Sequence, residues 1–473
     1  TIIGKYGPGA SDQDRDRLRQ AGIALEGHRE HNARERLLFH HVLSAARQGL
    51  YLSWRVHKDG GGEATPSAFL TEVQTILAGW ADVEAPAPRA DSFVPGPDGL
   101  GSVRDLRNAA FHHAPALRQA FPEACAAAVH GAAIEQYRQN DEPFGPYDGM
   151  LDDPDLAAET AARFGDAHIF SVNQFEAYLA CPFRFFSERI LGIRETDIPA
   201  AEFDPRRYGA ILHRALEKFH QQYAGKAIPG IDFEEAQETA RRAVAEAFKT
   251  MARSEITAPP GLVAAEEGRM MAQTGRYLNI EYGGNEQWKP LHFEVAFGPV
   301  KGPAGDPIST NDPFVLETPE GPIRFSGRID RIDRDGALAR IIDYKSGGTP
   351  SAGEIKRGLS LQLTLYAWVL EQALFENVSC AEAWFISVGN KKNSRNALKR
   401  KGTDREDLER NAMSAMLHAL RGIRAAQFPP VPAIEKTCDY CPFQAVCRHS
   451  KRRIERKAPA FAVGEEEDNG DED

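Results

Sequence analysis

The chain of 473 residues carries a formal net charge of −11 and 42% apolar residues, which suffices for two or three domains with sizeable cores. Its apolar runs all fall short of the roughly 20 residues that a membrane span needs, and nothing resembles a signal peptide, so we expect a soluble, cytoplasmic protein with no membrane partner. Seven of the last nine residues are acidic, so most of the net charge belongs to the tail and a nucleic-acid partner is not excluded. Six cysteines are too few for a disulfide scaffold in a chain of this size, so clustered cysteines indicate metal binding first.

The first third of the chain is predicted to form two segments. Residues 1–83 have mixed α/β character, with an apolar helical pattern in RERLLFHHVLSAARQG that runs into the strand-like LYLSWRV. Residues 84–165 form a linker and helical segment: a Pro-rich stretch, an Ala-rich helical stretch over 102–140, and a loop over 141–168 that leads into the next domain.

An α/β domain is predicted over residues 166–456. Helices are expected at 171–180, 208–223, 232–252, 354–375 and 403–426, and strands at 291–297, 323–332, 337–345 and 381–388. The order helix, three strands, helix, strand predicts a compact α/β core with a mixed sheet and helical insertions.

Charge runs mark the end of the chain. Two basic runs, at 391–401 and 448–457, are interpreted either as solvated surface or as nucleic-acid contacts. Residues 457–473 are predicted to be an acidic disordered tail.

Two aspartates and a lysine on neighbouring strands are the first candidate site. Asp330 lies near the end of one strand in GRIDRID, and Asp343 and Lys345 lie two apart on the next strand in IIDYKSG. Alternation along a strand places Asp343 and Lys345 on one face of the sheet. Converging carboxylates suit Mg²⁺, which can activate a water for attack on phosphorus, and a lysine can orient that water or stabilise developing charge. Ordinary charges on a surface hairpin are the alternative.

Two helices add further candidates. His213, in YGAILHRALEKF, precedes these strands and is a candidate imidazole ligand, although a lone histidine on an amphipathic helix is more often structural. Gln362 and Tyr366 are spaced i, i+4 and share one helical face, where they can hydrogen-bond a phosphate or a base edge. A tyrosine at a helix–sheet boundary is the simpler interpretation of that pair.

The cysteines are the most specific signal. Cys438, Cys441 and Cys447 follow a C-x₂-C-x₅-C spacing, and Cys181 stands alone some 250 residues earlier. Four thiolates suit either zinc or a [4Fe–4S] cluster. The single C-x₂-C pair favours the cluster, because structural zinc sites more often use two such pairs.

The order of these motifs resembles the RecB-like branch of the PD-(D/E)XK nuclease superfamily. The resemblance rests on His213, Asp330, the Asp343-Tyr344-Lys345 triplet and the Gln362-x₃-Tyr366 pair, in that order. The one-plus-three cysteines resemble the iron–sulfur nucleases of this branch, with the greatest likeness to the C-terminal nuclease region of AddB subunits of AddAB helicase–nucleases. About residues 166–455 are covered.

The resemblance implies a restriction-endonuclease-like core and a Mg²⁺- or Mn²⁺-dependent deoxyribonuclease. It implies that Asp330 and Asp343 bind the metal with help from His213, that Lys345 is the catalytic lysine, and that Gln362 and Tyr366 contact the DNA strand. It further implies a [4Fe–4S] cluster with four ligands: Cys181, Cys438, Cys441 and Cys447. Glu294, on the first strand, either reaches the metal or faces solvent, whereas Asp333 is interpreted as a neighbouring charge. The expected activity is exonucleolytic cleavage of single-stranded DNA ends in double-strand break repair and recombination, with a helicase–nuclease partner subunit.

Residues 1–83 are similar to the end of a superfamily 1 helicase core, with Ser44-Ala45-Ala46 in place of its usual Thr-Arg-Ala. The sequence contains no G-x₄-G-K-[ST] phosphate-binding loop, so this segment is interpreted as a helicase-like remnant. Three alternatives to the leading interpretation are a DNA-trimming nuclease like those of CRISPR adaptation, a catalytically silent DNA-binding scaffold and a redox sensor.

Overall fold

The computed structural model describes, apart from a few single residues before 122, residues 28–47, 67–77, 122–194, 204–252, 260–284, 287–300, 305–388, 395–398, 404–448 and 450–457. The chain divides into two compact units, Thr1–Cys125 and Ala126–Asp473.

Two helices of the first unit are described, α3 (His28–Ala45) and α4 (Ala68–Leu77). They contact each other through Phe39 and Phe69, whose ring centroids lie 5.4 Å apart. The expected strand LYLSWRV and the Pro-rich linker lie almost entirely outside the described residues, as does the tail after Lys457. The helicase-like remnant and the domain boundaries therefore stay predictions.

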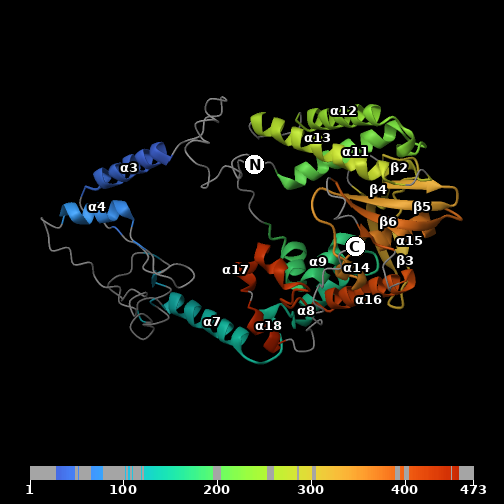
Figure 1. Ribbon diagram of the computed structural model, residues 1–473. Coiled ribbons are helices and arrows are strands. Elements are labelled where there is room, and N and C mark those ends of the chain that lie inside the picture. Colours follow the sequence, from blue (N-terminus) through green and yellow to red (C-terminus); the bar gives the residue numbers. More distant parts are fainter. Residues whose placement is uncertain are drawn as a thin grey trace. The chain divides into compact units, whose positions relative to one another are not determined.

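A seven-stranded mixed sheet is the centre of the second unit (Figure 1). Its strands are β1 (Ile169–Ser171), β2 (Lys289–Phe297), β3 (Phe314–Leu316), β4 (Ile323–Asp335), β5 (Leu338–Lys345), β6 (Ser379–Ser387) and β7 (Arg395–Asn396). The long strand β4 pairs with β1 in parallel and with β3 antiparallel over its first residues, and with β2 and β5 antiparallel over the remainder. Strand β6 continues the sheet in parallel with β5. The predicted mixed sheet is confirmed.

Helices cover both faces of this sheet, as Figure 1 shows. One face is covered by α11 (Pro205–Gln222), on which α12 (Phe233–Ala252) and α13 (Pro260–Tyr282) pack. The other face is covered by α9 (Val172–Ala180), α15 (Gln362–Val369) and α16 (Arg405–Arg424). The remaining helices in this account are α7 (Pro122–Gln139), α8 (Pro154–Arg163), α10 (Pro182–Phe185), α14 (Ala352–Lys356), α17 (Gln444–Cys447) and α18 (Lys451–Lys457). No helix among the described residues is long and apolar enough to cross a membrane.

The order of α11, three long strands, α15 and β6 confirms the predicted core, and two expectations within this unit are wrong. The single helix expected over 354–375 is two helices, because Gly358 adopts a left-handed φ of 69° and ends α14. A side chain there would also collide with the Asn411 carbonyl oxygen, 2.7 Å from an added Cβ. The loop expected over 141–168 contains α8, whose N-cap is Asp153.

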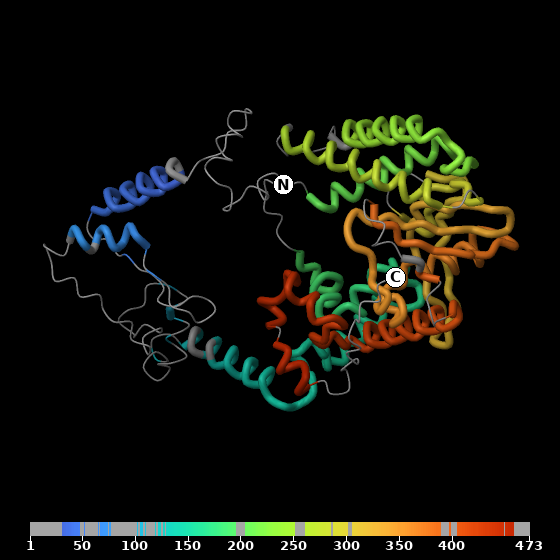
Figure 2. The backbone as a smooth tube through the Cα atoms, viewed as in Figure 1, coloured from blue at the N-terminus to red at the C-terminus, as the bar shows by residue number. Residues whose placement is uncertain are grey.

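The basic run at 448–457 is also not the solvated surface or nucleic-acid contact that its charge suggested. Arg453 and Lys457 of α18 are buried, 1% and 5% exposed, and both face the buried carboxylate of Asp148. Lys457 Nζ also donates to the Tyr137 carbonyl oxygen at 3.1 Å, which fixes α18 against the end of α7 (Figure 2). The run therefore holds the C-terminal segment in place. The other run, at 391–401, lies mostly outside the described residues.

Candidate metal-dependent active site

The site begins where the pairing of β4 and β5 stops. The last paired residues of that ladder are Arg331 and Ile342. One residue further on, the Asp330 carboxylate replaces the backbone acceptor and takes a hydrogen bond from the Tyr344 amide at 2.8 Å. This contact holds Asp330 beside the segment that carries Asp343 and Lys345.

Three side chains from three different elements form a candidate metal-binding group: His213 from α11, Glu294 from β2 and Asp330 from β4. One ligand atom from each lies within 4.8 Å of the other two. His213 Nε2 lies 3.0 Å from the Tyr344 carbonyl oxygen, which can only accept, so Nε2 carries a proton. Nδ1, 3.3 Å from the Asp330 carboxylate, is therefore the nitrogen left to bind a cation.

Glu294 belongs to this group by an unusual backbone. Its φ is 50°, which is rare for a residue other than glycine and costs roughly 1–3 kcal/mol. Its side chain is only 17% exposed and lies 3.5 Å from Arg328. Sequence analysis left open whether Glu294 faces solvent, and the structure places it with His213 and Asp330.

Asp343, Lys345 and Gln362 form the adjoining half of the site. Lys345 Nζ lies 2.7 Å from the Asp343 carboxylate, in agreement with the predicted common face of β5. Lys345 also donates to Gln362 Oε1 at 3.0 Å, and Gln362 Nε2 donates to Asp343 at 2.5 Å. The amide of Gln362 thus bridges the lysine and the carboxylate.

Tyr366 lies behind this group. Its ring is 4% exposed, its hydroxyl accepts from Gln362 Nε2 at 3.3 Å, and its edge packs on Phe297. Gly327 gives these rings their space, because an added Cβ would lie 2.7 Å from the Phe297 ring. The predicted contact of Gln362 and Tyr366 with a DNA strand stays a prediction.

The electrostatics of the site fit a divalent cation. Burial and the neighbouring Asp330 raise the pKa of Asp343 to about 7, and the same two causes raise the pKa of Glu294 to about 7. Burial alone would lower the pKa of His213, but the adjacent Asp330 carboxylate raises it to about 9. Carboxylates this close repel one another without a cation, and oxygen ligands with one imidazole suit Mg²⁺ or Mn²⁺.

Glu176 is a site residue that the sequence analysis missed. From α9 it accepts hydrogen bonds from the backbone amides of Leu361 and Gln362, at 2.8 and 3.2 Å. These bonds hold the start of α15, and with it the bridging amide of Gln362. An acidic residue beside the buried Phe175 was the available signal in the sequence.

The four predicted cluster cysteines line one pocket: Cys181, Cys438, Cys441 and Cys447. Cys181 lies between α9 and α10, and the C-terminal segment is held next to it by the Ala433 amide, which donates to the Ala180 carbonyl at 2.9 Å. Burial, opposed by backbone amides and reinforced by the other thiols, raises the pKa of Cys181 to about 12. Four converging thiols fit a metal or an iron–sulfur cluster, which would bind them as thiolates.

A comparison with protein families decides the family. The family model of the PD-(D/E)XK nuclease superfamily matches residues 169–448, which include every site residue described above. The chain belongs to the PD-(D/E)XK nuclease superfamily. The resemblance stated from the sequence is therefore confirmed.

Curated relatives are named as a subunit of an ATP-dependent helicase/deoxyribonuclease, the one that corresponds to AddB. The chain is 27% identical to those of Acetivibrio thermocellus and Symbiobacterium thermophilum, over 75% of its length and 31% of theirs. It is 26% identical to that of Desulforudis audaxviator, over 80% of its length and 34% of the relative. The chain thus spans about a third of the length of the curated relatives it matches.

Proposed function

We propose that this chain hydrolyses DNA phosphodiesters with Mg²⁺ or Mn²⁺ and works as the nuclease module of an AddB-type helicase–nuclease. The observation that carries the proposal is the convergence of His213, Glu294 and Asp330 within 4.8 Å beside the Asp343–Lys345 pair. The name of the relatives supports a DNA substrate and a partner subunit. Trimming of single-stranded ends during break repair is the finer form of the proposal.

The residues would divide the work between metal binding and charge stabilisation. His213, Glu294, Asp330 and Asp343 would hold the cation, which when bound polarises a phosphoryl oxygen and acidifies a water. Lys345, fixed by Asp343 and Gln362, would stabilise the charge that develops on the phosphate. Gln362 thereby acts as a positioning residue for the lysine.

A basic groove supports a nucleic-acid substrate. It has a volume of about 840 Å³ and runs between α14, α16 and the end of α9. Lys356, Arg357, His418 and Arg421 line it, and none of the described residues that line it is acidic. Leu359, also in its wall, is three residues from Gln362, so a strand bound there would lie near the site. We expect Lys356→Glu with Arg357→Glu to weaken single-stranded DNA binding and to flatten its salt dependence by about two phosphate contacts. Unchanged affinity would exclude the groove.

The cysteine pocket would hold the [4Fe–4S] cluster as a structural element. It would join the segment at Cys181 to the C-terminal stretch at Cys438–Cys447, closing a loop of more than 250 residues. Protein purified without oxygen should contain about four iron atoms per chain, and Cys438→Ala should lose them and melt earlier. Cys380→Ala is the matched control, since Cys380 is buried elsewhere in the core. Stoichiometric zinc would contradict the cluster.

The function is tested by Asp343→Ala in a cleavage assay on end-labelled single-stranded DNA with Mg²⁺. The variant should lose cleavage while keeping its DNA affinity in Ca²⁺. Asp335→Ala is the control, because Asp335 is an exposed residue at the far end of β4. Full cleavage by the Asp343 variant would overturn the proposal, and a wild type that binds DNA without cutting it would favour the scaffold alternative.

A further inference from the structure

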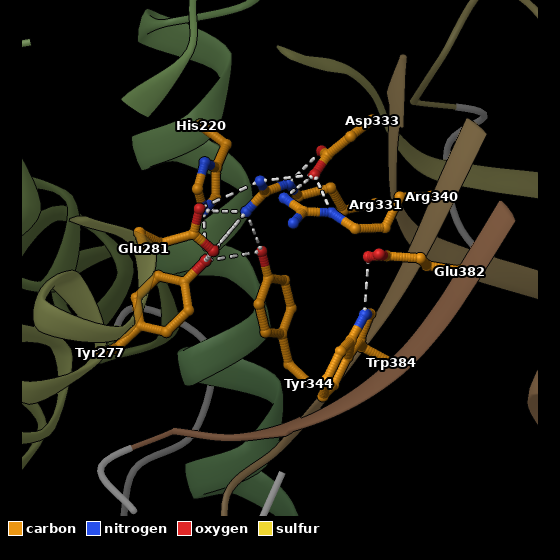
Figure 3. Close-up of polar contacts among 9 residues, drawn as sticks. All are labelled: His220, Tyr277, Glu281, Arg331, Asp333, Arg340, Tyr344, Glu382 and Trp384. Atoms are coloured by element: carbon orange, nitrogen blue, oxygen red, sulfur yellow. Dashed lines mark hydrogen bonds and ion pairs between the residues drawn. The ribbon is translucent and has the colours of Figure 1, made fainter. Parts of the chain in front are cut away.

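A buried polar network lies on the opposite side of β5 from Asp343 and Lys345. Figure 3 shows its members around one guanidinium, and we call it the Arg331 network: His220, Tyr277, Glu281, Arg331, Asp333, Arg340 and Tyr344. Arg331 Nη1 lies 3.0 Å from Glu281, 3.0 Å from both His220 Nε2 and the Tyr277 hydroxyl, and 3.1 Å from the Tyr344 hydroxyl. Its Nε and Nη2 donate to Asp333 at 2.5 and 2.8 Å.

The charges of this network are balanced within it. Two guanidinium groups, Arg331 and Arg340, face two carboxylates, Glu281 and Asp333. The Arg331 side chain is 1% exposed and that of Asp333 is fully buried, so solvent does not screen these contacts. Burial and Arg331 both lower the pKa of His220; the neutral ring accepts at Nε2 from Arg331. Such an array holds only if each partner stays in place, because an unpaired buried charge costs several kcal/mol.

The network is joined residue by residue to the candidate active site. On β4, Asp330 belongs to the site and Arg331 to the network. On β5, Tyr344 reaches the network from between Asp343 and Lys345. Helix α11 carries His213 in the site and, two turns later, His220 in the network.

Helix α13 supplies the anchor from outside the sheet. Its Tyr277 and Glu281 both contact Arg331, and the Tyr277 hydroxyl donates to Glu281 at 2.6 Å. Neither residue is part of the metal-binding group. Three elements that each deliver a site residue are thus tied to one point on a fourth.

We propose that the Arg331 network is a positioning device that sets α11, β4 and β5 relative to one another, so that His213, Asp330 and Asp343 meet as metal ligands. Glu281 and the Tyr344 hydroxyl are its positioning residues. The inference deepens the proposed function and rests on it, because it presumes that the group binds a divalent cation. Ligands must be held within about 0.5 Å of their productive positions, and a shift of the Tyr344 side chain moves Asp343 and Lys345 on either side of it.

The test is direct Mn²⁺ binding by calorimetry, without DNA, for Tyr344→Phe and Glu281→Gln. Tyr344→Phe removes only the hydroxyl and leaves the backbone contacts of residue 344 with His213 and Asp330. The control is Tyr223→Phe, another buried tyrosine, whose hydroxyl contacts Glu235 and Thr239 and no member of the network. Melting temperatures are recorded for all three variants.

We expect both network variants to weaken Mn²⁺ binding about tenfold, the lower end of the range for residues that support metal ligands. The kcat for DNA cleavage should fall with little change in KM for DNA, and Tyr223→Phe should lower only the melting temperature. If Tyr344→Phe melts earlier but binds Mn²⁺ as tightly as the wild type, the network is merely structural and the inference is overturned. Should Glu281→Gln fail to fold, Tyr344→Phe alone decides. A wild type that binds no Mn²⁺ would instead refute the proposed metal site.

Discussion

The buried contact between Asp148 and α18 gives a quantitative prediction for Asp148→Asn. The substitution keeps the size of the side chain and removes the charge that faces Lys457 at 3.2 Å and Arg453 at 3.9 Å. Breaking a buried ion pair costs about 3–5 kcal/mol. We take about 3 kcal/mol, because Lys457 keeps its contacts with the Tyr137 carbonyl and with Asn140.

That free energy translates into a measurable shift in melting temperature. With about 2.1 cal/mol/K per residue and about 300 ordered residues, the unfolding entropy is roughly 0.6 kcal/mol/K, so the variant should melt about 5 °C lower. Scanning calorimetry at low and at about 1 M salt should give the same shift, since buried charges are little screened. Asp152→Asn, a change of an exposed neighbour, is the control and should melt like the wild type. An unchanged melting temperature for Asp148→Asn would mean that α18 is solvated and that the basic run is free to bind DNA.

Two further predictions concern the core. Arg331 overcomes the effect of burial and lowers the pKa of Glu281 to about 2, and burial with Arg331 lowers that of His220. Both groups bind protons more readily when unfolded, so stability should fall as the pH drops below about 6.5 and more steeply below about 4.5, by up to about 1.4 kcal/mol per pH unit for each group. In urea titrations, His220→Gln should remove the loss between pH 6.5 and 5.5, and an unchanged slope would contradict the assignment. Gly327→Ala should cost about 1–3 kcal/mol because the new methyl group meets the Phe297 ring, whereas Gly268→Ala, with open space in α13, should be neutral or stabilising; equal stability of the two variants would be the refuting result.

Strand alternation and motif spacing predicted the core of the site because those features are local. The common face of Asp343 and Lys345 follows from the period of a strand, and the structure has them 2.7 Å apart. The convergence of Cys181 with Cys438 on one pocket was anticipated from the family pattern. Nothing local predicted it.

What the sequence did not reveal depends on partners far along the chain. Arg453 and Lys457 looked like surface charges because their counter-charge, Asp148, lies some 300 residues away. Arg331 looked like one of several charges in GRIDRID, and its burial depends on Glu281 from α13. That helix was itself not predicted, since two glycines, at 268 and 275, weaken its helical pattern.

The central claim is that the group around Asp330 and Asp343 cleaves DNA with a divalent cation. The most direct measurement is the rate of single-stranded DNA cleavage by this chain, without ATP, as a function of Mg²⁺ concentration, for the wild type and for Asp330→Asn. We predict saturable, Mg²⁺-dependent cleavage that chelation abolishes, and a rate about two to three orders of magnitude lower in the variant. Cleavage that persists in the chelator, or an Asp330→Asn variant as fast as the wild type, would contradict the account.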